Sequence, residues 1–391
     1  MNRLFLALLF LAGFGFIGSI EAQELFGPSP ADEIGFEPDS LASVFPRKQW
    51  DQIESSIDRA LEWLASQQQA DGSFPAIAAA QPAVTSLGVM AFLASGHVPE
   101  VGAYGGVIER AIDYVLSCQK EDGLLSAAEP EGRHVDKRPS HGATYNHAIA
   151  GLMLCEAFGM TASVRSRRIE AVVVNGLEFT RRIQTRPKNY SEDLGGWRYI
   201  RLRWTEQSTD SDLSVTGWHL MFMRAAKNAQ FDVPEEYISD AMSFVDRCWD
   251  PRQGVFKYSL IGADNKTSRG VVGVGILCQS MAGRHQTAMA MTAGEWLLEH
   301  PFKIFGETFG TGDRFFYSAY YCSQAMAQLG GRFWRGFFPP LVRVLLSSQT
   351  QSGAWPEEPR RGDAVFGNAY TTALAVLALT PAHQILPVYQ R

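Results

Sequence analysis

The sequence is poor in charge, and it lacks the short motifs that mark several common activities. Charged residues make up 19% of the 391 residues, the formal net charge is −6, and acidic and basic residues are interspersed. Because no basic stripe is present, we expect no nucleic-acid partner. No glycine-rich phosphate loop and no Gly-x-Ser-x-Gly segment occurs, which argues against P-loop nucleotide hydrolysis and against serine-hydrolase chemistry.

Cysteine is also scarce. The number of cysteines is odd and their spacings are wide, which makes a disulfide framework unexpected in a chain of this length. An exported protein has the alternative of a single bridge. We expect free, buried thiols that pack as small apolar side chains, at Cys118, Cys155, Cys248, Cys278 and Cys322.

Long hydrophobic runs are confined to the N-terminal segment. Arg3 is followed by an apolar run over residues 4–17, and Ala22 before Gln23 supplies a small residue for cleavage. This pattern is typical of a signal peptide over residues 1–22, since the run is shorter than the roughly 20 residues that span a bilayer. An uncleaved N-terminal anchor is the alternative. We therefore expect export, to the periplasm or outside the cell.

Two further segments follow this leader. Residues 23–47 contain Pro28, Pro30, Pro38 and Pro46, and they are expected to form an extended linker. From residue 48 to residue 391 the pattern is helical and repetitive, so we expect a single helical domain there. The sequence gives no support to strands.

One unit recurs along this domain: an amphipathic helix ending in Gln, a polar turn with Gly, and then an aromatic or apolar residue. The clear copies occupy residues 60–74, 111–124 and 341–355, and degraded copies occupy 176–197 and 241–256. We expect the Gly to close the helix in the left-handed conformation. We also expect the Gln amide to tie the helix end to the backbone of the neighbouring repeat. Such self-similarity indicates an array.

Two kinds of helix alternate between these turns. The apolar kind is rich in Ala and Gly nearly all round, and the amphipathic kind has one apolar face. Six of each predict an all-α, closed (α/α)6 barrel, or alpha-alpha toroid, because an open solenoid needs polar capping repeats and none is visible. The expected inner helices are 84–94, 145–159, 214–226, 271–282, 316–328 and 370–379; the expected outer helices are 52–66, 107–118, 167–183, 235–248, 288–298 and 334–347.

The Gln-x-x-x-Asp-Gly-Ser-Phe segment at residues 67–74 resembles the repeat shared by squalene cyclases and the β-subunits of protein prenyltransferases. This prenyltransferase and squalene oxidase repeat covers nearly the whole helical domain. The segments 144–148, 214–218 and 369–373 resemble signatures of exported bacterial, squalene-cyclase-like members of the terpenoid cyclase superfamily. The Cys-Gly-Glu-Gln thioester segment of complement-like relatives is absent.

The resemblance implies one catalytic candidate. Class II terpene cyclases protonate an alkene with the middle acid of an Asp-x-Asp-Asp segment at the start of an inner helix, and such an acid needs a raised pKa. Residues 210–213 carry Asp210 and Asp212 at the first two acidic positions, with Asp212 in the place of the proton donor, but Leu213 replaces the last acid. The favoured alternative is that Asp212 or Ser214 is an N-cap of the helix that begins there.

No metal and no cofactor are expected. Asp246 and Cys248 have the spacing of the zinc ligands of prenyltransferases, but they fall at the end of an outer helix. His141 and His147 lie six residues apart, which is not the one-turn spacing that lets two histidines share an ion.

Aromatic and histidine side chains on the inner helices are the candidates for lining a cavity. Electron-rich ring faces stabilise cations, as a carbocation cascade requires, although the same rings also pack barrel cores. Core packing is the favoured reading for the cluster at residues 315–321, and a buried, hydrogen-bonded state is favoured for His147. The candidate lining residues are Tyr145, His147, Trp218, His219, Tyr317, Tyr321 and Tyr370.

Two functions therefore stay open. The first is a terpenoid-cyclase-like or prenyltransferase-like protein that binds an apolar, isoprenoid-type ligand in the barrel. If it is an enzyme, it is an isomerase of the terpene cyclase and mutase kind, or a transferase of the prenyltransferase kind. The second is a non-catalytic exported binding or scaffold module, which the replacement by Leu213 favours. Squalene-type cyclases use two barrels where this chain builds one, and an exported protein would not meet cytosolic allylic diphosphates.

Overall fold

The computed structural model describes residues 40–130, 138–200, 209–262, 266–307, 309, 312–359 and 364–390. These residues belong to a compact unit spanning Ser40–Arg391. The leader predicted for residues 1–22 lies outside the described residues. Of the linker predicted for 23–47, residues 40–47 are described: a short 3₁₀ helix, Leu41–Val44, contacts an outer helix through a hydrogen bond of 2.9 Å from Trp334 Nε1 to the Leu41 carbonyl.

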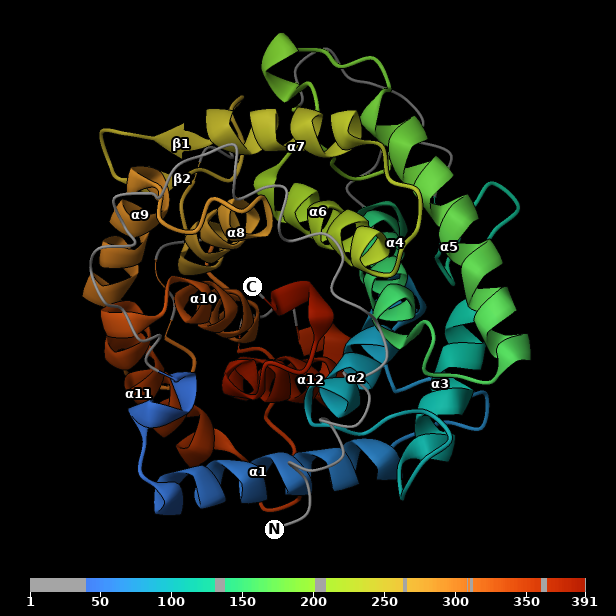
Figure 1. Cartoon of the computed structure of the whole chain (residues 1–391), viewed down its shortest axis with the longest axis vertical. Coiled ribbons are helices and arrows are strands. Elements are labelled where there is room, and N and C mark those ends of the chain that lie inside the picture. The colour runs from blue at the N-terminus through green and yellow to red at the C-terminus, as the bar shows by residue number, and fades with distance from the viewer. Residues whose placement is uncertain are drawn as a thin grey trace, which may run out of the picture. The chain divides into compact units, whose positions relative to one another are not determined.

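Twelve α-helices occupy the described part of Ser40–Arg391, in two concentric rings (Figure 1). The inner helices touch in the order α2, α4, α6, α8, α10 and α12, and α12 in turn contacts α2. The predicted closed (α/α)6 toroid is therefore confirmed. The inner helices are α2 Ala83–Ala94, α4 Arg138–Ala157, α6 Leu213–Asn228, α8 Arg269–Met281, α10 Phe315–Leu329 and α12 Gly367–Leu379; the outer helices are α1 Arg47–Ser66, α3 Gly105–Ser117, α5 Ser163–Gln184, α7 Glu235–Arg247, α9 Ala288–Glu299 and α11 Gly331–Ser348.

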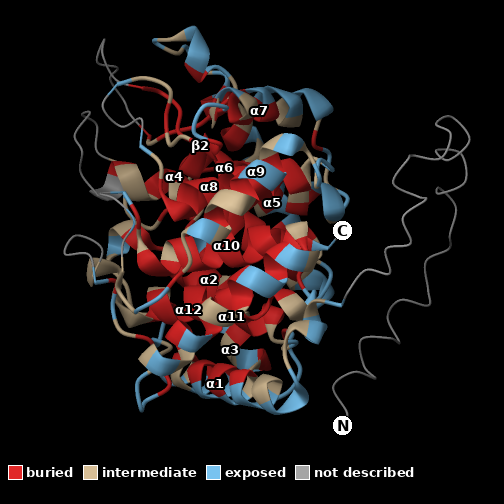
Figure 2. Ribbon diagram, turned by 90° about the vertical axis from the view of Figure 1, so that its left-hand side faces the viewer, coloured by how far each residue is buried: buried red, intermediate tan, exposed pale blue. Residues whose placement is uncertain are grey.

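The division between the rings follows from the apolar pattern of each helix. Every residue of α2 is buried, whereas α1 buries a stripe that includes Ile53, Ile57 and Leu64 and leaves its other face in solvent. Figure 2 shows the buried residues concentrated on the inner helices and the exposed ones on the outer helices. Small residues let the inner helices approach: a Cβ on Gly217 would lie 2.4 Å from the Val274 side chain.

The Gln amides link neighbouring repeats as the sequence predicts. Gln68 Nε2 donates to the carbonyl of Gly72 at 3.0 Å, and to that of Val107 in the next outer helix at 2.8 Å. Gln119, Gln184 and Gln349 repeat this pair of bonds, to the Gly at the end of their own turn and to the following outer helix. In the first copy the linking residue is therefore Gln68, not Gln67.

The glycine of the unit has a different position from the one expected. Gly72 lies in the turn, six residues beyond the last residue of α1 at Ser66, rather than at the helix end. Its φ of +93° is left-handed, and a Cβ there would lie 2.3 Å from the Arg110 carbonyl oxygen. Gly353 has the same two properties, with a φ of +95° and Arg59 as the neighbour. The glycine is required by close contact with the next outer helix as well as by backbone conformation.

The last of these links closes the ring. Gln349 is the residue after α11. Its Nε2 donates to the Ser56 carbonyl of α1 at 2.9 Å, and its Oε1 accepts from Ser56 Oγ at 2.8 Å. Arg59 also donates to this amide oxygen. First and last outer helices are thereby joined across 293 positions of sequence.

Two short strands form in a region where no strand was expected. Strands β1, Trp249–Asp250, and β2, Val255–Phe256, pair antiparallel in the degraded turn after α7. Two-residue strands are too short to carry an alternating pattern, which is why periodicity does not detect them.

The C-terminal segment enters the ring at the end where the inner helices finish (Figure 1). The 3₁₀ helix Pro387–Tyr389 contacts α6, and the Tyr389 hydroxyl contacts the Tyr320 hydroxyl of α10. Val388 N–H lies 3.5 Å from a carboxylate oxygen of Glu156 on α4. Burial raises the pKa of Glu156 to about 8. This end of the toroid is therefore occupied by the chain itself.

Candidate functional site

Asp212 begins the inner helix α6. Its carboxylate accepts the Val215 N–H at 2.8 Å, which is the N-cap geometry that the sequence favoured. The side chain is fully buried, and Oδ2 lies 3.7 Å from Nη1 of Arg198. These contacts give the buried Asp212 carboxyl group a structural role, as the cap of α6 beside Arg198.

Asp210 belongs to a different set of contacts. It accepts the N–H of Asn189 at 2.8 Å, and its own N–H donates to Asp193 at 2.6 Å. Lys188 Nζ donates to the Asp210 carbonyl at 3.2 Å, and burial lowers the pKa of this lysine to about 8. These contacts fasten the segment before α6 to the turn that follows α5. Asp210 thus anchors the entry to the helix, which accounts for its burial without a role as a partner of a proton donor.

Four phenol rings gather around Ser214 in the first turn of α6. Ser214 Oγ lies 2.9 Å from the Tyr145 hydroxyl of α4 and 2.6 Å from the Tyr317 hydroxyl of α10. A second hydroxyl pair, at 2.8 Å, joins Tyr199 to Tyr258 in the loops beside α6. All four tyrosines are partly exposed, so we call Tyr145, Tyr199, Tyr258 and Tyr317 the tyrosine rim. Two of the hydroxyls therefore meet at Ser214 Oγ and the other two meet each other, and His141 stacks on the Tyr199 ring at 3.9 Å.

The rim is uncharged but lies beside a buried ion pair. Burial and secondly the charge of Asp212 raise the pKa of Tyr199 and of Tyr258 above the ordinary phenol value. The Arg198 guanidinium lies 4.9 Å from the centre of the Tyr199 ring and 5.5 Å from that of Tyr258. Cation–π contacts of this kind orient the rings around the guanidinium.

Below the rim the interior is filled by aromatic side chains. Tyr317 is followed by Tyr321 at a ring distance of 4.8 Å, and Trp218 packs on Tyr320 and Tyr321 at 5.6 and 5.2 Å. Trp218, Tyr320 and Tyr321 are at most 1% exposed, which agrees with the core packing favoured from the sequence. Trp218 Nε1 has no hydrogen-bond partner among the described residues. Tyr370 of α12 is partly exposed and packs on Phe366 at 5.4 Å.

The two histidines expected in the lining lie elsewhere. His147 lies between α4 and α5: its Nδ1 accepts the Leu125 N–H at 3.2 Å, and its Nε2 lies 3.1 Å from the Gly176 carbonyl. Burial lowers the pKa of His147 to about 3. His219 stacks on Trp197 at 4.7 Å, also between the rings. Both side chains project toward the outer ring. Because the inner helices are apolar nearly all round, composition alone does not distinguish the face toward the axis from the face toward the outer ring.

The residues with metal-ligand spacing form no metal site in the described part of the chain. Asp246 accepts from Gln279 at 2.7 Å and from Arg284 at 2.9 Å, whereas Cys248 is fully buried. No group of three or more His, Cys, Asp or Glu side chains able to hold a metal ion occurs among the described residues. All five cysteines are free and buried.

Two features of this site were not found from the sequence. Arg198 and Tyr199 lie in the insertion before α6, and Tyr258 follows β2, so no helical periodicity marks them. Their proximity comes from the backbone bonds of the two loops: Asp212 N–H donates to the Trp197 carbonyl at 2.9 Å, and Leu213 N–H to the Tyr258 carbonyl at 2.8 Å. The one signal available was Ser214 beside Asp212, a small polar residue in the first turn of an inner helix.

No family model matches the chain, and no curated protein matches it. Solved structures do resemble it. Type II terpene cyclase MstE from Scytonema, in complex with geranylgeranyl dihydroxybenzoate, is 14% identical, with a TM-score of 0.54 over 88% of this chain and 100% of that chain. An alpha-amylase from Clostridium perfringens is 10% identical, with a TM-score of 0.54 over 84% and 97%. A glycosidase in complex with glucose is 12% identical, with a TM-score of 0.53 over 88% and 100%.

These neighbours establish the fold. The chain has the same toroid of helices as the terpene cyclase MstE, and glycosidases share this arrangement. At such low identity neither activity follows from the likeness. Within the described residues, no helix combines the length and the apolar character needed to cross a membrane.

Proposed function

We propose that the tyrosine rim binds an apolar, isoprenoid-type small molecule, and that the protein acts as a binding module without proton-initiated cyclisation. The observation that carries the proposal is the rim itself: four partly exposed rings, two with hydroxyls bonded to Ser214 and two with hydroxyls bonded to each other. Ring faces presented in this way favour ligands with methyl-rich or C–H surfaces. MstE, which shares the fold, was solved with a geranylgeranyl compound, which supports this ligand class.

The non-catalytic part of the proposal rests on Asp212. A class II cyclase needs an acid at this position that passes its proton to the ligand, yet the Asp212 carboxyl group accepts the Val215 N–H as the cap of α6 and lies 3.7 Å from Arg198 Nη1. Leu213, fully buried, stands where a further acid would be needed to assist the donor. Together these features support binding rather than chemistry.

Binding is tested with farnesol and geranylgeraniol, followed by tryptophan fluorescence and by calorimetry, with glucose as the comparison ligand. Tyr317→Phe keeps the ring and removes the hydroxyl, so the affinity for geranylgeraniol should change by less than about threefold. Tyr317→Leu removes the ring face and should weaken binding by roughly tenfold, the scale of one aromatic contact. If glucose binds and neither isoprenoid does at millimolar concentration, the apolar ligand class is wrong.

Catalysis is tested on the same samples by mass spectrometry of the recovered isoprenoid. We expect the starting material unchanged, for the wild type and for Asp212→Asn alike. Asn also caps helices well, so this variant should fold. A cyclised product that forms with the wild type and is lost in Asp212→Asn would establish Asp212 as an acid and overturn the non-catalytic proposal.

We also propose that the protein is exported through its first 22 residues, on the apolar run at 4–17 and the small residues before Gln23. Expression of the full chain in a bacterial host, followed by fractionation and intact-mass measurement, tests this. A mature protein that starts at Gln23 outside the cytoplasm is expected. An unprocessed chain held in the membrane fraction would favour the anchor instead.

A further inference from the structure

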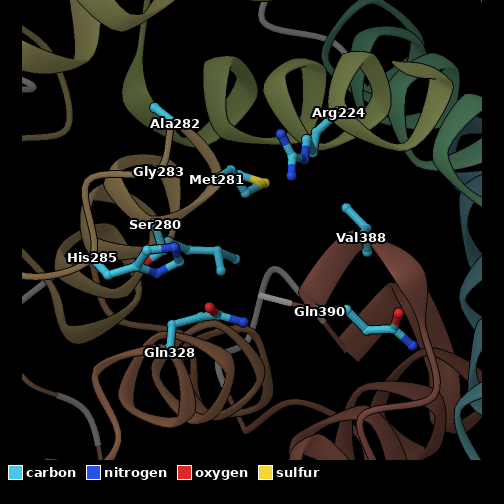
Figure 3. Close-up of a pocket in the computed structure, with 10 residues that line it drawn as sticks. Arg224, Ser280, Met281, Ala282, Gly283, His285, Gln328, Val388 and Gln390 are labelled. Atoms are coloured by element: carbon cyan, nitrogen blue, oxygen red, sulfur yellow. The ribbon is translucent and has the colours of Figure 1, made fainter. Parts of the chain in front are cut away.

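A small pocket lies at the opposite end of the inner helices from the tyrosine rim. It has a volume of about 180 Å³ and is bounded by α6, by the end of α8, by α10 and by the C-terminal segment (Figure 3). Arg224 lies ten residues after Ser214 on α6, or roughly 15 Å along the helix at 1.5 Å per residue. Water occupies roughly 30 Å³ in the liquid, so the pocket has room for a molecule of several heavy atoms.

Arg224 dominates the charge of this pocket. Figure 3 shows its guanidinium directed from α6 into the space between Met281 and Val388. The side chain is partly buried, and it forms no ion pair or hydrogen bond with any described residue. None of the ten lining residues is acidic. A guanidinium in a concave site with no counter-ion among the described residues is suited to an oxyanion, because its planar fork donates two parallel hydrogen bonds.

Ser280 supplies a second, independent indication. It lines the same pocket near the end of α8, is 4% exposed, and its hydroxyl has no hydrogen-bond partner among the described residues. A buried hydroxyl left unpaired is destabilising, so such groups usually face a ligand or ordered water. The hydroxyl therefore offers a second donor to an anion held by Arg224.

The carbonyl groups at the helix ends beside the pocket do not oppose the binding of an anion there. The C-terminal carbonyls of α6 are already bonded, since Ala229, Gln230 and Phe231 N–H groups donate to the carbonyls of residues 225–227. The last carbonyls of α8, at residues 278–280, accept from the N–H groups of residues 282–284 in the same way. Capped carbonyls present less negative charge to the pocket than bare ones.

From these contacts we infer that the pocket binds a small carboxylate with a short apolar chain. Arg224 receives the carboxylate, Ser280 donates to it, and the side chains of Leu277, Met281 and Val388 contact the chain. Because Val388 belongs to the segment that fills this end of the ring, an occupied pocket holds that segment against α6 and α8. This site is separate from the proposed rim site, and either can exist without the other.

Butanoate and hexanoate are the probes, with butanamide as the neutral analogue of matched shape and inorganic phosphate as the anion without an apolar chain. Calorimetry at pH 7 should give butanoate a Kd below about 1 mM, with butanamide at least tenfold weaker because a charged hydrogen bond is lost. Phosphate should bind more weakly than butanoate. Equal binding of butanoate and butanamide, or no butanoate binding at 10 mM, would overturn the inference.

Matched variants test which residues hold the carboxylate. Arg224→Gln should weaken butanoate binding by roughly tenfold or more, and Ser280→Ala by roughly three- to tenfold. Lys227→Gln, an exposed charge on the same helix, should leave it unchanged. Arg224→Lys keeps the charge and should retain part of the affinity, which covers the case in which Arg224→Gln folds poorly. Unaltered binding by a folded Arg224→Gln would show that the anion binds elsewhere.

Discussion

The ring-closing amide of Gln349 gives the sharpest test of what holds the toroid together. Its Nε2 donates to the carbonyls of Ser56 and Gly353, at 2.9 and 2.7 Å, and its Oε1 accepts from Ser56 Oγ at 2.8 Å. Gln349→Ala removes these three bonds and also the one that Arg59 donates to Oε1. At a net value of about 0.5–1.5 kcal/mol per bond, and with water replacing part of the loss at this partly exposed position, we expect a loss of about 2 kcal/mol.

The expected change in melting temperature follows from the size of the unit. About 350 residues at roughly 2.1 cal/mol/K each give an unfolding entropy of about 0.7 kcal/mol/K, so the melting temperature should fall by about 3 °C. Differential scanning calorimetry measures this. Gln351→Ala, an exposed glutamine in the same turn, is the control and should change the melting temperature by less than 1 °C.

The position of the weakened region is also specified. Amide hydrogen exchange should accelerate in α1 and in residues 349–355 of Gln349→Ala, because these are the segments that the amide joins. Gln119→Ala, which removes the equivalent bonds inside the array, should instead loosen the contact between residues 119–123 and α5. If Gln349→Ala and Gln351→Ala behave alike, the amide does not contribute to closure and the reasoning fails.

Three more outcomes are expected. Gly353→Ala should lower the free energy of unfolding by about 2–4 kcal/mol, because it combines a left-handed φ with a Cβ 2.4 Å from the Arg59 carbonyl oxygen. Gly102 has a φ of +72° but open space around it, so Gly102→Ala should cost only about 1 kcal/mol. Urea unfolding measures both, and equal losses would contradict the steric argument. Because the pKa of Glu156 is about 8 in the folded protein and about 4.5 when unfolded, its contribution to stability is lost as pH rises between these values, by about 1.4 kcal/mol per unit at most. Glu156→Gln should flatten this decline, and an unchanged pH profile would contradict the raised pKa. The pH dependence due to His147 has the opposite direction: its pKa is about 3 in the folded protein, so its contribution to stability is lost as the pH falls below about 6.5. Melting curves from pH 7 to pH 4 should show a smaller loss of stability for His147→Gln than for the wild type, and an equal loss in both proteins would contradict the lowered pKa.

The ring architecture could be predicted because each layer has its own composition. Helices such as α2, apolar on every side, can only be interior, and stripes such as that of α1 need one covered face. The Gln amide links could also be predicted, since a repeated amide at a helix end has one obvious use. Helix α4 begins at Arg138 rather than at the expected position 145, and Pro139 fits there because proline is tolerated in the first turn of a helix.

The site was harder to predict, for reasons of geometry. The inner helices are apolar nearly all round, so the sequence pattern does not tell His147, which faces α5, from Tyr145, which belongs to the rim. Arg198 and Tyr258 come from loops whose paths depend on tertiary contacts rather than on local pattern. The Asp212 cap was accessible from sequence because capping is a local interaction.

Closure through Gln349 has a consequence for how such a chain can change length. In an open array a helix pair can be gained or lost, because each pair contacts only its neighbours. Here the angles between successive pairs must sum to a full turn, and an added pair would separate α1 from the Gln349 amide. Insertions and deletions should therefore accumulate in the connections between helices, where they alter the two ends of the toroid and leave the frame of six helix pairs intact.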